Sequence, residues 1–169
     1  MRRDQKRDSR EFVKREFETK VVEIKRVTRV VAGGKRMRFR ALVVTGDRNG
    51  RVGIGLKKGT DVAEAVAKAS AQAKKTMVRI PIKEGTIPHA VKIKYKAAVV
   101  FLKPARTGSG ITAGGPVRAV VNLAGIKNIS SKMLGASNKV SNVRATFEAL
   151  KTFKNPEPPV TNQPKPANS

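Results

Sequence analysis

Hydrophobic and polar residues alternate along the first part of the chain in a pattern that predicts strands. A run rich in β-branched residues from Val21 to Val31 predicts the first strand, which ends at the turn Ala32-Gly33-Gly34. In the second strand we expect apolar residues on the core side and arginines on the other, because side chains alternate between the faces of a sheet. The apolar set is Met37, Phe39, Ala41 and Val43, and the basic set is Arg36, Arg38 and Arg40.

A turn and a third strand follow. The segment GDRNG at residues 46–50 has the composition of a hairpin turn, and the next strand has an apolar side formed by Val52, Ile54 and Leu56. Gly53 and Gly55 lie on its other side, where they would let another backbone approach closely.

The pattern then changes to that of a helix. The segment TDVAE predicts a helix capped by Thr60 or Asp61. One face of this helix carries Val62, Val66, Ala69, Ala73 and Met77. Residues 19–82 therefore predict a β-β-β-α unit, which is a truncated form of a double-stranded-RNA-binding domain.

A second unit is predicted over residues 83–154. Val91, Ile93 and Tyr95 alternate with lysines in a first strand, and the apolar segment 98–102 forms a second strand that stops before Pro104. A helix begins near Pro116 and closes at Gly125. A strand near Ile126 to Met133 and a last helix carrying Val143, Phe147 and Leu150 complete a β-β-α-β-α order. The predicted fold class is α+β, with two small cores.

Both ends of the chain differ from these units. Residues 1–18 mix charges without a clear period and are interpreted as a basic arm, and residues 155–169 contain five prolines and are interpreted as a disordered tail. The longest apolar run, residues 97–102, is too short to span a bilayer, and the N-terminus lacks the apolar segment of a secretory signal. We expect a cytoplasmic protein without a membrane partner.

Charge gives the clearest indication of function. The 169 residues include 37 Lys and Arg against 12 Asp and Glu, which gives a formal net charge of +25. Such an excess repels itself, and a polyanion would neutralise it, so we predict nucleic-acid binding. Aromatic residues are only 4% of the chain, which favours recognition of the RNA backbone over base stacking on an aromatic platform.

The predicted RNA contacts concentrate in the first unit, where residues 24–46 contain no acid. Arginine matches phosphate with a planar fork, so several cations on one strand face could follow an RNA backbone. The first group is Lys25, Arg26, Arg29, Lys35, Arg36, Arg38 and Arg40, and the neighbouring hairpin adds Arg48, Asn49, Arg51, Lys57 and Lys58.

The glycine-rich segment TGSGITAGGP at residues 107–116 resembles nucleotide-binding loops but lacks their essential partners. A P-loop needs Lys and Ser or Thr after its second glycine, where Pro116 and Val117 stand. A dinucleotide site needs a downstream acid, and residues 85–147 contain neither Asp nor Glu. His89 is interpreted as a loop residue, and the chain has no Cys. We therefore predict no catalytic residue, no metal and no cofactor.

Three stretches resemble the bacterial small-subunit ribosomal protein five family: residues 33–55, GTIPHAVK at 85–92, and residues 108–150. This resemblance implies a double-stranded-RNA-binding-like domain followed by an α/β domain with a left-handed βαβ crossover. It implies a structural component of the ribosome that binds 16S rRNA, contacts ribosomal proteins four and eight, lies near the mRNA entry path and influences translational accuracy.

The resemblance also assigns two local surfaces. The loop near the spectinomycin site corresponds to Val27, Thr28, Arg29, Gly33, Gly34 and Lys35. The protein–protein interface corresponds to Arg106, Gly108, Gly110, Gly114 and Arg118. Two alternatives remain open: a small-molecule kinase, which the missing carboxylates disfavour because phosphoryl transfer needs magnesium ligands, and a free-standing RNA chaperone.

Overall fold

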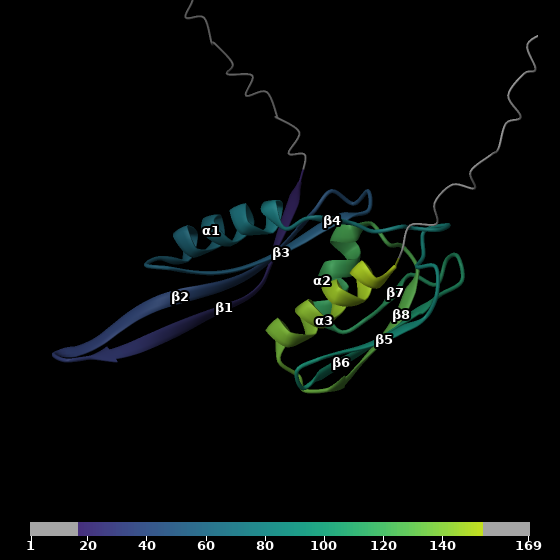
Figure 1. The fold of residues 1–169 in the computed structure, drawn as a ribbon. Coiled ribbons are helices and arrows are strands. Elements are labelled where there is room, and N and C mark those ends of the chain that lie inside the picture. Colours follow the sequence, from purple (N-terminus) through teal and green to yellow (C-terminus); the bar gives the residue numbers. More distant parts are fainter. Residues whose placement is uncertain (1–16, 154–169) are drawn as a thin grey trace, which may run out of the picture.

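The computed structural model describes residues 17–153, which form two sheets and three helices (Figure 1). The N-terminal sheet has the order β1-β2-β3-β4, from β1 (Glu18–Val31), β2 (Gly34–Gly46), β3 (Arg51–Gly59) and β4 (Val78–Arg79), with α1 (Val62–Lys75) after β3. The C-terminal sheet has the order β5-β6-β8-β7, from β5 (Val91–Tyr95), β6 (Ala98–Pro104), β7 (Ile111–Thr112) and β8 (Ile129–Gly135), with α2 (Gly115–Ala124) and α3 (Lys139–Thr152).

The predicted α+β class and the order of the long elements are confirmed. Two strands were not predicted, β4 and β7, because two residues are too few to show an alternation. β4 adds to the edge of β3, and β7 lies parallel to β8. Glu18, which was assigned to the arm, begins β1 opposite Gly46. The rest of the arm and the Pro-rich tail lie outside the described residues.

α1 packs on one face of the N-terminal sheet through small residues. The predicted close approach at Gly53 and Gly55 is confirmed, since a Cβ atom at either position would meet a backbone carbonyl of α1. The buried face of α1 is Ala65, Ala69 and Ala73, and the predicted Val62 and Val66 are only partly buried. The glycines bring the helix so close that only alanine fits between the two backbones.

The start of α1 is held by two acidic side chains. Asp61 is the N-cap and accepts a hydrogen bond from the backbone N–H of Ala63. Glu64 accepts hydrogen bonds from the Lys68 ammonium and from the hydroxyl and backbone N–H of Thr60. These bonds, that of Lys68 foremost, lower the pKa of Glu64 from 4.5 to about 2. The helix therefore begins with one capped N–H group, that of Ala63, and with an acid in its first turn, which favours the positive end of the helix dipole.

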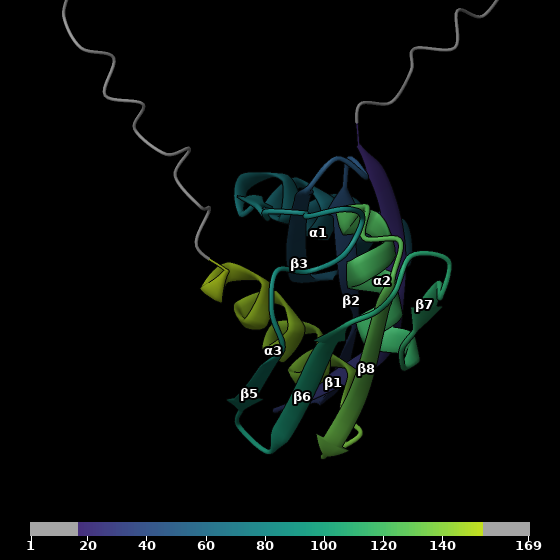
Figure 2. The same cartoon turned by 90° about the vertical axis from the view of Figure 1, so that its right-hand side faces the viewer.

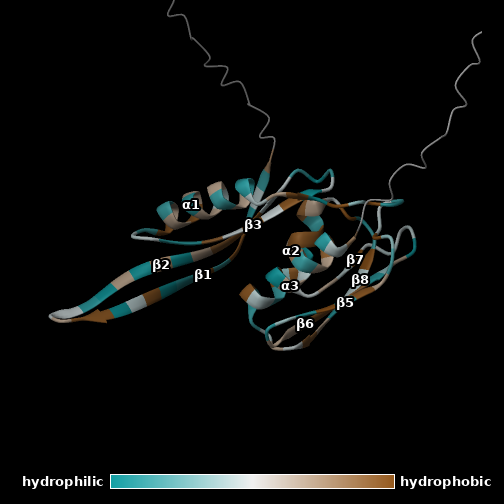
Figure 3. Ribbon diagram, viewed as in Figure 1, coloured by the Kyte–Doolittle hydropathy of each residue, from teal (hydrophilic) through white to brown (hydrophobic). Residues whose placement is uncertain are grey.

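The other face of the N-terminal sheet packs against the second unit, so the expected pair of separate small cores is wrong. Leu42, Val44 and Val52 belong to one buried cluster with Leu123 of α2 and Phe147 of α3. α2 and α3 lie between the two sheets (Figure 1). Figure 3 shows hydrophobic positions along α2, where the two units meet. This larger cluster joins both units and fixes their relative position by apolar burial, while a smaller cluster, Ala41, Val43, Ala65 and Ala69, lies between the N-terminal sheet and α1.

Backbone hydrogen bonds add to this contact at the β2–β3 turn. The N–H of Arg48 donates to the carbonyl of Leu123 at 3.0 Å, and that of Gly50 donates to Ala124 at 2.9 Å. Gly125 ends α2 in a left-handed conformation with φ 88°, and a Cβ atom there would meet the Arg48 carbonyl. The end of α2 is therefore tied to the first sheet.

Replacing Gly55 by alanine should destabilise the protein. The added methyl group would meet the carbonyl of Ala69, so α1 must move away from β3, at a cost of about 1–3 kcal/mol for overpacking. Gly115→Ala is the matched control, because a Cβ atom there meets nothing within 4 Å. Urea unfolding of the two variants measures the difference, and equal stabilities would contradict the packing described for α1.

Candidate nucleic-acid interface

The β1–β2 hairpin projects beyond the rest of the molecule (Figure 1). The two strands stay paired from Glu18 and Gly46 to Val31 and Gly34 at the tip. Gly33 and Gly34 form the tip with φ of 89° and 141°, values that favour glycine. The outer half of the hairpin carries mainly hydrophilic residues with hydrophobic positions between them (Figure 3). The hairpin therefore presents its side chains on two accessible faces.

The strand register gathers six of the predicted cations on one face. Residues directly opposite each other in antiparallel strands point to the same side of a sheet. Lys25, Arg40 and Lys58 form one row across β1, β2 and β3, and Arg29 lies opposite Arg36. We call this set the basic hairpin face, and its members are Lys25, Arg29, Arg36, Arg38, Arg40 and Lys58.

The same register separates three predicted cations from that face. Arg26, Lys35 and Lys57 lie opposite Phe39, Val30 and Ala41, so they point to the side on which α1 packs. The prediction treated the basic residues as one continuous patch. Alternation along β2 predicted that its arginines lie opposite its apolar residues. The same alternation was not applied to the cations of β1 and β3, which the register divides between the two faces.

The remaining predicted residues lie at the other end of the sheet. Arg48 and Asn49 lie in the turn between β2 and β3, and Arg51 is the first residue of β3. Arg36 lies ten positions before Gly46, the last residue of β2, so roughly 33 Å of extended strand separates it from this turn. Arg48 pairs with Glu18, and the Arg51 Nε lies 3.3 Å from Asp47. These residues form a second cluster with acidic partners of its own.

A hollow of about 600 Å³ lies at the basic hairpin face. It takes residues from all three long strands: Val27, Thr28, Arg29, Val31, Ala32, Arg36, Arg38 and Lys58. Of the six residues assigned to the spectinomycin loop, Val27, Thr28 and Arg29 line this hollow, and the others lie at or beside the tip. Four of its lining residues are cations, so the hollow is suited to bind an anionic partner.

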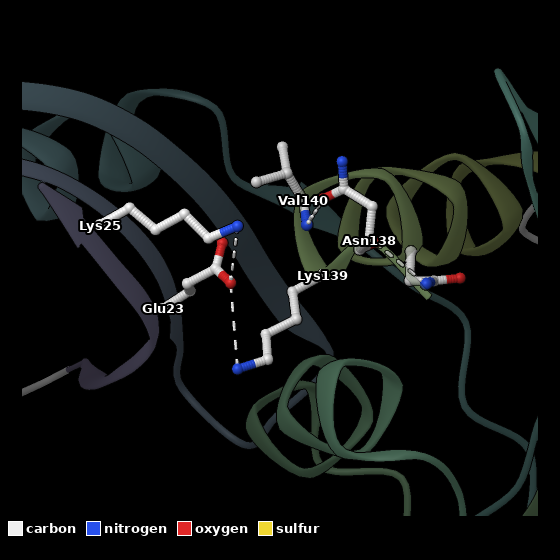
Figure 4. A network of polar contacts seen from close by, with 6 residues as sticks. Glu23, Lys25, Asn138, Lys139 and Val140 are labelled. Atoms are coloured by element: carbon white, nitrogen blue, oxygen red, sulfur yellow. Dashed lines mark hydrogen bonds and ion pairs between the residues drawn. The ribbon is translucent and has the colours of Figure 1, made fainter. Parts of the chain in front are cut away.

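Among the described residues, Glu23 is the acid that borders the basic hairpin face. Its side chain is 12% exposed, and its Oε1 lies 3.6 Å from the Lys25 Nζ and 3.9 Å from the Lys139 Nζ of α3 (Figure 4). Glu23 lies opposite Leu42, the first residue of β2 in the shared core. The basic face therefore ends where the contact between the two units begins.

The opposite side of the hairpin is partly apolar. Ile24, Val30 and Met37 are 44%, 74% and 57% exposed. Met37 was expected on the core side, and this expectation is wrong, because α1 covers the strand only from Phe39 onward. Alternation gave its face correctly, but the helix does not extend far enough to bury it.

The glycine-rich segment 107–116 has its amides engaged by the protein itself. Gly108 and Gly110 adopt φ of 88° and 69°, and the side-chain oxygen of Asn128 accepts a hydrogen bond from each of their N–H groups at 3.1 Å. Asn128 is only 6% exposed. The two donors that a phosphate would need are therefore already occupied, as the prediction of a structural turn requires. Sequence reasoning missed Asn128, since it lies 18 residues beyond Gly110.

The predicted protein–protein residues surround this turn and the start of α2. Arg106, Gly108 and Arg118 are exposed, and Arg118 donates a hydrogen bond to the carbonyl of Ile111 at 3.1 Å. Gly114 is the N-cap of α2, where a Cβ atom would meet the Met133 side chain. The structure thus brings the start of α2 and the glycine turn into one surface region.

Residues 17–153 also bear on two further classes of function, membrane insertion and metal binding. Within this part of the chain, no helix is long and apolar enough to cross a membrane. The same residues contain no group of three His, Cys, Asp or Glu side chains that could hold a metal ion.

Comparison with known proteins identifies relatives over most of the chain. The family described as ribosomal protein S5, N-terminal domain, matches residues 17–81, and that described as ribosomal protein S5, C-terminal domain, matches residues 93–163. The chain is 54% identical over 142 residues to the small ribosomal subunit protein uS5 of Persephonella marina, strain DSM 14350 / EX-H1. This alignment covers 83% of the chain and 73% of that relative.

Removing the side chain of Asn128 should destabilise the glycine turn. Asn128→Ala leaves the N–H groups of Gly108 and Gly110 without their acceptor, which should lower the free energy of unfolding by about 1–3 kcal/mol. Asn122→Ala, at an exposed position of α2, is the matched control and should change stability little. Thermal or urea unfolding compares the two, and an equal effect would show that Asn128 does not hold the turn.

Proposed function

The chain belongs to the ribosomal protein S5 family, and we propose that it is a structural constituent of the small ribosomal subunit. Members of this family are structural proteins, so the prediction that the chain is not an enzyme is confirmed. In the proposed role it binds 16S rRNA through the basic hairpin face and acts in the ribosome, in the cytoplasm.

The charge rows on the hairpin carry this proposal. Lys25, Arg40 and Lys58 stand side by side on neighbouring strands, and like charges in such positions destabilise a sheet. RNA phosphates would convert this repulsion into attraction and release counterions. The projecting hairpin, its hollow and the planar arginine side chains all suit a folded RNA backbone.

The glycine turn supports the second part of the proposal, a contact with neighbouring ribosomal proteins. Its amides are satisfied by Asn128, and Arg106 and Arg118 remain exposed beside it. We assign this surface to a protein neighbour, with ribosomal proteins four and eight as the partners, and propose that it influences translational accuracy. The hairpin tip is proposed to lie near the spectinomycin site, and the protein near the mRNA entry path.

The triple variant Arg36→Gln, Arg38→Gln, Arg40→Gln should bind rRNA more weakly and with less dependence on salt. Each lost phosphate contact makes the negative slope of log K against log salt shallower by about 0.9. The slope of the triple variant should therefore be shallower by between about two and three units. Binding of a structured 16S rRNA fragment at several salt concentrations measures this slope.

The matched control removes three charges from the opposite face of the same sheet, by Arg26→Gln, Lys35→Gln and Lys57→Gln. It should change the slope less than the first triple variant does. Equal slopes for both variants would mean that net charge alone governs binding, and an unchanged slope in the first would refute the assignment of the basic hairpin face.

Changes at the glycine turn should affect decoding while leaving rRNA binding nearly intact. Gly110→Asp adds a charge at φ 69°, a conformation that Asp tolerates better than most residues, so the fold should survive. Arg118→Ala removes an exposed guanidinium from the same region. If this surface contacts a neighbour in only one subunit conformation, either variant shifts the equilibrium between conformations.

The measurement is the misreading rate of ribosomes that carry each variant, with rRNA binding measured in parallel. An altered misreading rate and an unchanged rRNA affinity are expected. Unchanged misreading in both variants would contradict the interface assignment, and so would micromolar ATP binding that Gly110→Asp abolishes.

Co-sedimentation with small subunits in high salt separates a ribosomal constituent from a free-standing RNA chaperone.

A further inference from the structure

The C-terminal sheet has one face packed on helices and one face turned outward. α2 and α3 cover the inner face, where Ala98, Val100 and Leu102 are fully buried. In Figure 2, β6 and β8 lie in front of the helices, and none of the described elements covers this side of the sheet. Alternation places eight further residues there, which we call the open sheet face: Lys92, Lys94, Val99, Phe101, Lys103, Ser130, Lys132 and Leu134.

The register places an aromatic ring between two lysines. Phe101 of β6 lies opposite Lys92 of β5 on one side and opposite Lys132 of β8 on the other. Neighbouring strands are about 4.8 Å apart, so the two ammonium groups flank the ring within reach of one nucleotide and its neighbours. The next row along the same face is Lys94, Val99 and Leu134.

No acid balances these cations within the C-terminal sheet. Lys92, Lys94, Lys103 and Lys132 are exposed, and residues 85–147 contain neither Asp nor Glu. A sheet face that meets only solvent normally mixes charges of both signs, whereas four cations without an acid favour an anionic ligand. This surface is separate from the basic hairpin face, which belongs to the other sheet.

We propose that the open sheet face binds single-stranded RNA, with a base stacked on Phe101 and phosphates held by Lys92 and Lys132. A partly exposed aromatic ring on a sheet, flanked by cations, suits an unpaired base, whereas a duplex offers phosphates but no free base face. A protein partner is less well matched, because the apolar part is only three side chains, of which Leu134 is 40% exposed. The inference rests on the proposed ribosomal role as the source of the RNA.

A tryptophan at this site would report on the proposed stacking directly. The chain has no Trp, so Phe101→Trp in the full-length protein introduces a single tryptophan, whose emission can be excited apart from that of Tyr95. A uridine decamer should quench its emission, and Lys92→Gln with Lys132→Gln in the same background should lower the salt slope by about 1.4, or 0.7 for each phosphate contact. In a separate assay with a labelled decamer, Phe101→Leu should weaken binding at least about fivefold relative to the unmodified chain.

The matched control, Lys83→Gln with Lys127→Gln, removes the same charge from exposed positions outside this face and should leave the quenching nearly unchanged. Absence of quenching would overturn the proposal in favour of a protein neighbour, and equal effects of the two lysine pairs would overturn the assigned contacts. The triple variant at Arg36, Arg38 and Arg40, made in the Phe101→Trp background, should retain the quenching by the uridine decamer and bind the structured rRNA fragment more weakly. Failure of the hairpin proposal is thereby distinguished from failure at this site.

Discussion

Burial of β2 on both faces is the constraint on which the rest of the structure depends. All residues from Ala41 to Gly46 are buried. Ala41 and Val43 pack against α1, and Leu42 and Val44 join the core that β2 shares with α2 and α3. One half of the strand is thus clamped between two layers, and the other half extends from this clamp as the projecting hairpin. The glycines of β3 make the arrangement possible by admitting α1 at backbone distance.

The face of β2 that carries the arginines becomes apolar at the point where the strand is packed on both sides. Its alternate positions carry arginine as far as Arg40 and then leucine and valine, so the cations stop where water is excluded. Glu23 marks this boundary, with one lysine of β1 and one of α3 around its carboxylate. Because the inner half of the hairpin is packed on both sides, the cation rows stand at a fixed spacing relative to the core. Such an array suits a polyanion, since the strands are already ordered and only the exposed side chains lose freedom on binding.

Two glycine turns of this fold, at the hairpin tip and before α2, differ in whether other residues contact them. At the hairpin tip, positive φ at Gly33 and Gly34 reverses the chain with both faces left open. In the turn before α2, the amides of Gly108 and Gly110 point at the Asn128 side chain, and this bond makes the loop part of the protein scaffold. A glycine-rich turn can bind an anion only where its N–H groups are free, and a residue distant in sequence decides whether they are.

The sequence by itself determined the α+β class, the order of the long strands and helices, a helix cap at Thr60 or Asp61 and the basic character of the hairpin, because periodicity, capping and charge are local properties. Only the tertiary structure decided which cations act together. Lys57 and Lys58 are neighbours in sequence and point to opposite faces, whereas Lys25 and Lys58 are 33 positions apart and share a row. It also decided that Met37 is exposed and that two units share one core. The physical reason is that alternation fixes sides within one strand, while strand register and the reach of a covering helix depend on contacts between distant segments.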